Sequence, residues 1–148
     1  MHEYQQFRFA LFPQCIGQAP ELDNPAHLFA LGEVLGQLHE VAAKKPFQHR
    51  GTLLLREGVT EAEQRVVTSP WLNNHQTRAY QNAVDKIRRQ LETVHIPSAS
   101  MIRTHGDCHL GNILGRDETF TLVDFDDCLM APAIQDIWML LPMENPQL

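Results

Sequence analysis

Acidic and amide side chains that could bind a cation gather in two neighbouring stretches of the sequence, HGDCHLGN and LVDFDD. Asn112 ends the first stretch, and Asp124 lies in the second, after a short apolar run. If the chain folds back at residues 115–118, both side chains come to the same edge of a hairpin. A carboxylate and an amide oxygen suit Mg²⁺, which completes its coordination with waters and phosphate oxygens. The spacing therefore predicts a magnesium site formed by Asn112 and Asp124.

Asp107 lies five residues before Asn112, in the same predicted loop. Phosphoryl transfer needs an acceptor hydroxyl held in line, a carboxylate to take its proton and a metal ion to offset the phosphate charge. Asp107 can accept the proton of the hydroxyl, while Asn112 and Asp124, later in the chain, bind the metal ion. The sequence thus predicts a phosphotransfer site in which Asp107 is the base.

The elements before this loop are predicted from turn residues and apolar spacing. Residues 7–12, FRFALF, indicate a short strand that ends before Pro13. A helix is expected to begin at an N-cap, Asp23 or Asn24, and to end at Lys44 and Lys45. We expect His39, on this helix, to pack beside the core. Apolar residues recur there every three or four positions, which predicts one buried stripe: Leu28, Leu31, Leu35, Leu38 and Ala42.

After the first helix, apolar spacing and turn residues predict the elements less clearly. The stretch 47–70 is left irregular, although one or two helical turns over TEAEQRVV stay open. A second helix follows, because apolar residues recur at helical spacing before Pro97: Tyr80, Val84, Ile87, Leu91 and Val94. These predictions make 24–96 a helical region. Residues 101–128 are expected to form a strand, the catalytic loop and the metal-binding hairpin, and 133–141 a terminal helix after Pro132.

The motifs resemble those of a known family. HGDCHLGNIL followed by LVDFDD is similar to the catalytic loop and metal-binding segment of protein-kinase-like phosphotransferases, in the aminoglycoside phosphotransferase and choline kinase branch. With APAIQDIWMLL, LGEVLGQLHEVA and FRFALFP, they resemble the stress response kinase A family of bacterial Ser/Thr protein kinases. The resemblance implies an α+β fold: the mainly helical C-terminal-lobe portion of a protein-kinase-like fold, with a short catalytic β-hairpin.

The resemblance also implies a role for particular residues. Asp107 would be the catalytic base, with Asn112 a magnesium ligand and Asp124 the principal one. Asp136 would hydrogen-bond the catalytic loop and fix its geometry, and His105 would support that loop. The implied cofactors are Mg²⁺ and ATP, and the implied acceptor is a protein Ser/Thr hydroxyl or a small-molecule hydroxyl.

Other positions of the resemblance concern the nucleotide. The backbone of Phe12, Pro13, Gln14 and Cys15 falls where a hinge would meet adenine, and His109 would contact phosphate. Asp126 stands where the common kinase pattern DFG has glycine. The eight glycines never form GxGxxG, and the lysines lie on or beside predicted helices. We therefore expect the N-terminal lobe to be missing, so that the chain is a fragment of the enzyme.

Composition sets the broader expectations. With 148 residues, 43% of them hydrophobic, the chain can bury one core, which predicts one compact unit over 1–148. The resemblance implies that this unit is a single partial domain. A net charge of -6 and dispersed basic residues argue against nucleic acid as a partner. No apolar run reaches the roughly 18 to 20 residues that span a bilayer, and no export signal is visible, so no membrane partner is expected. Three cysteines without CxxC spacing favour the cytoplasm.

Two alternatives to a phosphotransferase stay open. In a metal-dependent phosphoester hydrolase, His105, Asp107 and His109 would hold Zn²⁺ or Mn²⁺ together with Asp124 and Asp127. In a non-catalytic fragment, the face that normally meets the missing lobe would be exposed, which predicts self-association. Cys108, beside Asp107, is expected to pack in the core rather than act as a nucleophile.

Overall fold

Helices and two-stranded sheets follow one another along the part of the chain that the computed structural model describes, residues 2–116 and 119–141. The helices are α1 (Pro25–Ala42), α2 (Leu55–Val67) and α3 (Asn74–Thr93). The strands are β1 (His2–Tyr4), β2 (Phe7–Phe9), β3 (Met101–Thr104), β4 (Ile113–Arg116), β5 (Thr119–Leu122) and β6 (Leu129–Pro132). The strands pair as β1 with β2, β3 with β6 and β4 with β5, all antiparallel.

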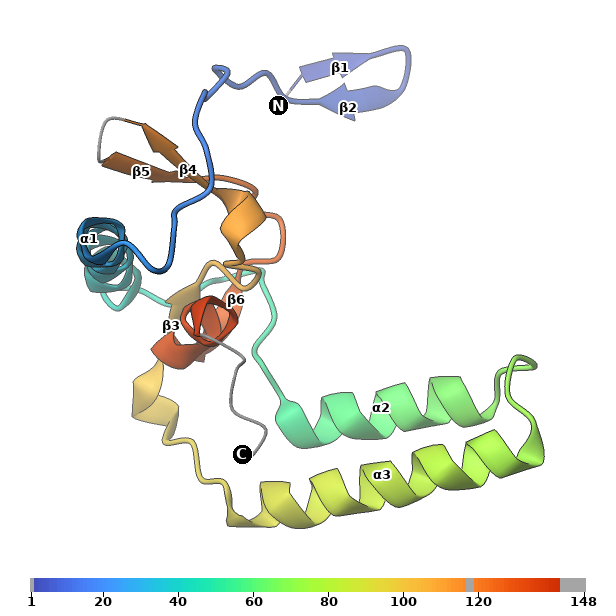
Figure 1. Ribbon diagram of the computed structural model, residues 1–148. Helices are drawn as coiled ribbons and strands as arrows, with labels where there is room; N and C mark the ends of the chain where they lie inside the picture. The colour runs from blue at the N-terminus through green and yellow to red at the C-terminus, as the bar shows by residue number, and fades with distance from the viewer. Residues whose placement is uncertain (1, 117–118, 142–148) are drawn as a thin grey trace.

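β1 and β2 form a hairpin that lies apart from the rest of the described fold (Figure 1). Gln5 and Gln6 both have positive φ, 46° and 72°, which suits the tight two-residue turns whose twist matches paired strands. The strand predicted over 7–12 is too long, because β2 covers only Phe7–Phe9. β2 ends at Phe9, which pairs with His2.

The prediction for α1 is confirmed at its beginning and along its buried face. Asn24 is the N-cap, its side chain accepts a hydrogen bond from the Ala26 N–H at 3.0 Å, and Pro25 occupies the first turn. Leu31, Leu35 and Ala42 are buried, whereas Leu28 stays 47% exposed. The helix ends at Ala42, two residues before the expected lysine pair.

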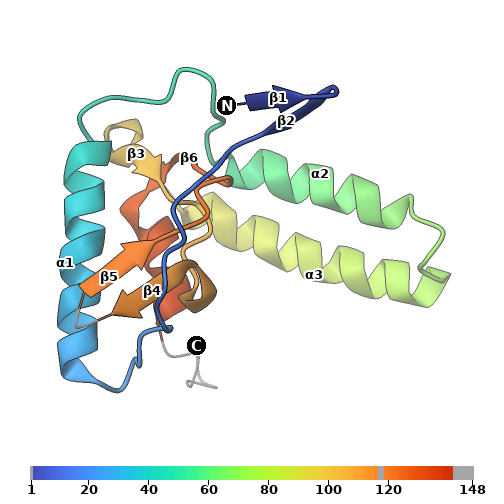
Figure 2. The same ribbon diagram turned by 90° about the horizontal axis from the view of Figure 1, so that it is seen from above.

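The stretch 47–70 contains a helix that the sequence left unassigned. α2 runs antiparallel beside α3, and the two form an arm that extends away from the sheets (Figures 1 and 2). None of the described residues of α2 is fully buried. α3 begins six residues before Tyr80, at a capping box formed by Asn73 and Gln76. A salt bridge of 2.5 Å joins Arg88 on α3 to Glu63 on α2.

The core lies between α1 and the two C-terminal sheets. Its buried members are Leu31, Leu35, Cys108, Ile113 and Leu140. The loop after α1 is attached to β6, because Leu53 N–H donates to the Met130 carbonyl at 2.8 Å and Met130 N–H donates to the Gly51 carbonyl at 2.9 Å. The arm thus branches from a point where the chain is tied to the β3–β6 sheet, whose strands precede and follow the loop of Asp107.

The prediction of one continuous terminal helix over 133–141 is wrong. The structure has two short 3₁₀ helices, Ala133–Asp136 and Trp138–Leu140. The Ile137 and Leu140 N–H groups bond to carbonyls three residues back. Apolar spacing of three and four does not distinguish this geometry from an α-helix, and so short a segment gains little from α-helical cooperativity.

The predicted hairpin around Asn112 and Asp124 is present as β4 and β5, with Ile113 opposite Leu122 and Arg116 opposite Thr119. Its turn was predicted at 115–118; residues 117–118 lie outside the described residues. No helix among those described is both long and apolar enough to span a membrane.

Candidate active site

Asp107 and Asn112 lie in contact within the loop between β3 and β4. Asn112 is 8% exposed, and its Nδ2 donates to the Asp107 carbonyl at 2.9 Å and lies 3.4 Å from Asp107 Oδ2. The N–H of Val123, one residue before Asp124, donates to the Asn112 carbonyl at 3.0 Å. These bonds attach the loop of Asp107 to the end of the hairpin that bears Asp124.

Asp124 occupies the left-handed backbone region, with φ +63°, and its side chain is exposed. The preceding residue is fixed by two hydrogen bonds, since the Val123 carbonyl also accepts from His105 Nε2 at 2.8 Å. The next residue, Phe125, places its ring 4.6 Å from the His105 ring. The chain therefore turns sharply at Asp124 between two anchored neighbours, a conformation that costs a non-glycine residue on the order of 1 kcal/mol.

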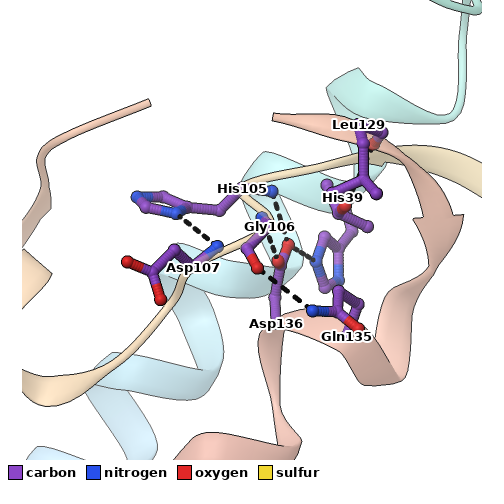
Figure 3. Close-up of polar contacts among 8 residues, drawn as sticks. His39, His105, Gly106, Asp107, Leu129, Gln135 and Asp136 are labelled. Atoms are coloured by element: carbon purple, nitrogen blue, oxygen red, sulfur yellow. Dashed lines mark hydrogen bonds and ion pairs between the residues drawn. The ribbon is translucent and has the colours of Figure 1, made fainter. Parts of the chain in front are cut away.

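Asp136 holds the beginning of the loop, as the resemblance implied (Figure 3). It is 0% exposed, and its Oδ2 and Oδ1 accept from the N–H groups of His105 and Gly106, each at 2.9 Å. Asp136 Oδ2 also lies 2.9 Å from His39 Nε2 on α1. Because a carboxylate can only accept, His39 donates from Nε2.

Gly106 is the one described glycine with positive φ, +91°. A Cβ at this position would fall 2.1 Å from the Asp127 carbonyl oxygen. Only glycine fits this close approach between the catalytic loop and the segment after Asp124. The carbonyl of Asp126, in the same segment, accepts a hydrogen bond from Arg50.

A cavity of about 520 Å³ lies between the 12–15 segment and the end of β5. Phe12, Pro13 and Cys15 line one side, and residues 121–126, including Asp124, line the other. Paired hydrogen bonds between Gln18 and Gly115, of 2.9 and 2.7 Å, attach the 12–20 stretch to β4. Gln14 does not line this cavity.

His109 lies beside Asp107 instead of in that cavity. Its Nδ1 accepts from the Gly111 N–H at 2.9 Å, and its Nε2 lies 3.5 Å from Asp107 Oδ2. The side chains of His109 and Asp107 are 48% and 41% exposed, so both are accessible to a ligand.

The oxygen donors fit the metal that the sequence predicts. Nδ2 of Asn112 is engaged by the Asp107 carbonyl, which leaves Oδ1 as the amide's acceptor. Together with the exposed carboxylate of Asp124, this is a donor set of hard oxygens suited to Mg²⁺. Within the described ranges, no three His, Cys, Asp or Glu side chains gather as a metal-binding group.

Cys108 is a core residue, as expected. It is 0% exposed, and burial, followed by the negative charges of Asp136 and Asp107, raises the pKa of its thiol to about 12. A thiol that stays protonated at neutral pH is a poor nucleophile.

Two residues that contact Asp136 or the loop of Asp107 escaped the sequence analysis. His39 was expected only to pack beside the core, although its place four residues after Leu35 puts it on the buried face of α1. Gln135 had no assigned role, yet its Nε2 donates to the Gly106 carbonyl at 3.0 Å. The place of His39, a polar residue on a predicted buried stripe, could have indicated that it has a buried polar partner. No sequence pattern marks Gln135 in this way.

The fold and this loop define a kinase-like phosphotransferase class. Two solved structures with a similar fold are an amicoumacin kinase in complex with AMP-PNP, Ca²⁺ and Ami, and a spectinomycin phosphotransferase in complex with ADP and spectinomycin. Their TM-scores are 0.61 and 0.60 at 23% and 20% identity. The match covers 89% and 84% of this chain, and 42% and 44% of theirs.

The chain belongs to the phosphotransferase enzyme family, whose model matches residues 2–147. Stress response kinase A of Salmonella choleraesuis (strain SC-B67) is 37% identical over 138 residues, and the Escherichia coli (strain K12) protein of that name is 36% identical. Each match covers 93% of this chain. The chain spans 42% of the length of these relatives.

Proposed function

We propose that this chain forms part of an ATP-dependent phosphotransferase of the stress response kinase A type, which transfers the γ-phosphoryl group to a hydroxyl. The names of the most similar relatives support a protein Ser/Thr acceptor, because one is called a serine/threonine protein kinase. A small-molecule hydroxyl is the alternative that the two antibiotic kinases of similar fold support. The chain spans 42% of its relatives, so the proposal concerns this site as part of such an enzyme.

The observation that carries the proposal is the cavity between the 12–15 segment and Asp124. Its volume of about 520 Å³ and its mainly apolar walls suit a purine ring system. Asp124 is among the residues that line the cavity, so the polyphosphate of a nucleotide seated there would lie near this proposed metal ligand. Phe12, Pro13 and Cys15 would contact the adenine, with Gln14 beside them.

The loop residues would divide the chemistry among themselves. The Asp107 carboxylate would accept the proton of the attacking hydroxyl, with no covalent intermediate on the protein. Mg²⁺, when bound by Asn112 and Asp124, would offset negative charge on the phosphates. His109, 3.5 Å from Asp107, would donate its Nε2 hydrogen to a phosphate oxygen at the same opening.

Alkylation of Cys15 tests nucleotide binding by the chain itself. Cys15 is exposed and lines the cavity, whereas the half-buried Cys128 lies outside it and serves as an internal control. Mg·ATP should slow alkylation of Cys15 but not of Cys128, as measured by mass spectrometry of labelled peptides. Asp124→Asn should weaken the protection by Mg·ATP, because it removes one of the two proposed metal ligands. Alkylation of Cys15 at an unchanged rate under saturating Mg·ATP would count against this site.

Phosphate transfer from labelled ATP to Ser/Thr-containing protein tests the reaction. Asp107→Asn should lower turnover about 10²- to 10⁴-fold, the usual contribution of a general base, while the protection of Cys15 persists. Equal turnover by the variant and the wild-type chain would remove Asp107 from the mechanism. Cleavage of a phosphoester without ATP, with transition metal retained after purification, would favour the hydrolase instead.

A further inference from the structure

Two adjacent residues of the 3₁₀ helix Ala133–Asp136 hold Gly106 from both sides (Figure 3). The Gly106 N–H donates to Asp136 Oδ1 at 2.9 Å, and the Gly106 carbonyl accepts from Gln135 Nε2 at 3.0 Å. Gln135 is partly buried, so this hydrogen bond is shielded from the bulk solvent. The peptide that receives the Gln135 bond is the one that leads directly into Asp107.

The orientation of this peptide needs an external support. Glycine rotates about its backbone bonds more freely than any other residue, and Gly106 has φ +91°. Asp136 fixes the N–H side of Gly106, and as a carboxylate it can only accept hydrogen bonds, so it cannot hold the Gly106 carbonyl. On the other side of the residue, the Asp127 carbonyl leaves no room for a Cβ. Gln135 is therefore the side chain that holds the Gly106 carbonyl in one direction.

The orientation of the Gly106 carbonyl also sets the orientation of the Asp107 backbone, because the two residues share one planar peptide unit. Its N–H belongs to the same rigid unit as the Gly106 carbonyl and points towards His105 Nδ1, 3.4 Å away. Its own carbonyl is held by Asn112 Nδ2 at 2.9 Å. A rotation of the Gly106–Asp107 peptide would turn the Cα–Cβ bond of Asp107 relative to Asn112 and so redirect the carboxylate.

We propose that Gln135 is a positioning residue: by donating to the Gly106 carbonyl, it fixes the peptide that sets the direction of the Asp107 carboxylate. The catalytic consequence rests on the proposed function of Asp107, whereas the hydrogen bond and its effect on the peptide do not. The role requires a donor at the end of a side chain of this length. Met has a similar length and no donor, and an ionised Glu would present oxygen to oxygen.

Isotope labelling makes the bond directly observable, because Gly106–Asp107 is the only Gly–Asp pair in the sequence. With ¹³C in glycine carbonyls and ¹⁵N in aspartate, the 148-residue chain gives a single carbonyl–nitrogen correlation. Gln135→Met should move this correlation, with the carbonyl ¹³C shifted upfield by loss of the hydrogen bond. Gln37→Met, at an exposed position of α1, is the matched control and should leave it in place.

A pH titration separates the donor from mere side-chain packing. In Gln135→Glu the correlation should be displaced at neutral pH and return towards the wild-type position on acidification, because a protonated carboxyl group again donates to the carbonyl. The same titration of the wild-type chain accounts for Asp107 itself. An unchanged correlation in both Gln135 variants would overturn the proposal.

Kinetics decide whether the bond matters for transfer. Where the wild-type protein transfers phosphate, Gln135→Met should lower kcat on the order of 100-fold, the effect of a small misplacement of a reacting group, with KM for ATP unchanged. A displaced correlation with unchanged kcat would refute the positioning role. Absence of transfer in the wild type would contradict the proposed function instead, and the labelling result would still decide whether Gln135 orients the peptide.

Discussion

Nε2 of His39 lies 2.9 Å from Oδ2 of Asp136, a residue 97 positions further along the chain. The carboxylate is completely buried, and the His39 side chain is 15% exposed. Because the same carboxylate accepts from two N–H groups at the start of the catalytic loop, one side chain joins α1, that loop and the segment after β6. Buried carboxylates are stable only when such partners surround them.

His39→Ala should therefore destabilise the chain more than an ordinary surface substitution. It removes a hydrogen-bond donor from a buried carboxylate, which costs about 1–3 kcal/mol. Urea denaturation followed by circular dichroism would measure the difference. His75→Ala, at an exposed position of α3, is the control and should change stability by less than about 0.5 kcal/mol. Equal midpoints for the two variants would contradict the importance of the His39–Asp136 bond.

Gly106→Ala should be strongly unfavourable. The new Cβ would meet the Asp127 carbonyl at 2.1 Å, and φ +91° is rarely adopted by L side chains. We expect a loss of more than about 2 kcal/mol, seen as a lower midpoint in urea. Gly36→Ala is the matched comparison, since nothing lies within 4 Å of its Cβ on α1. That change should stabilise the helix by about 0.5–1 kcal/mol, so two substitutions of the same type should have opposite signs.

The sequence predicted the local elements best where the apolar spacing agreed with the capping and turn residues. Asn24 and Pro25 begin α1, and Leu31 and Leu35 face the core, because capping and amphipathic spacing act within one helix. α2 was missed since it packs mainly against α3 and buries none of its residues fully.

The candidate site was predictable to the extent that its residues are neighbours along the chain. Asn112 and Asp107 are five positions apart, and a hairpin returns the chain towards Asp124. The contacts of His39 and Gln135 depend on how α1 and a 3₁₀ turn meet the loop in three dimensions. No local propensity encodes such contacts, so they become visible only in the folded chain.

The three cysteines should react with an alkylating reagent in a fixed order. Cys15 is exposed, Cys128 is partly buried and its pKa is raised mainly by burial, and Cys108 is completely buried. Mass spectrometry over time should show Cys15 labelled first, Cys128 more slowly and Cys108 only with global unfolding. Early labelling of Cys108 in the native chain would mean that the core around the catalytic loop opens locally.

Alkaline pH should weaken the fold through Cys108. The pKa of an ordinary thiol is 9.0, whereas the pKa of Cys108 in the folded chain is about 12. At a pH between these two values, the unfolded chain therefore loses a proton that the folded chain keeps. The free energy of unfolding should fall as pH rises above 9.0, with a slope from this group of up to about 1.4 kcal/mol per pH unit. Urea titrations at pH 8 to 10.5 would measure it. In Cys108→Ala this part of the slope should vanish, and parallel curves for the two proteins would contradict the assignment.

The α2–α3 arm leaves and re-enters the rest of the fold at the same end, where Arg56 Nη2 donates to the Leu91 carbonyl at 2.7 Å (Figure 2). Topologically, the arm is thus one long hairpin loop inserted between two neighbouring points. Its length and outer surface can change without rerouting the backbone through Asp107, Asn112 and Asp124.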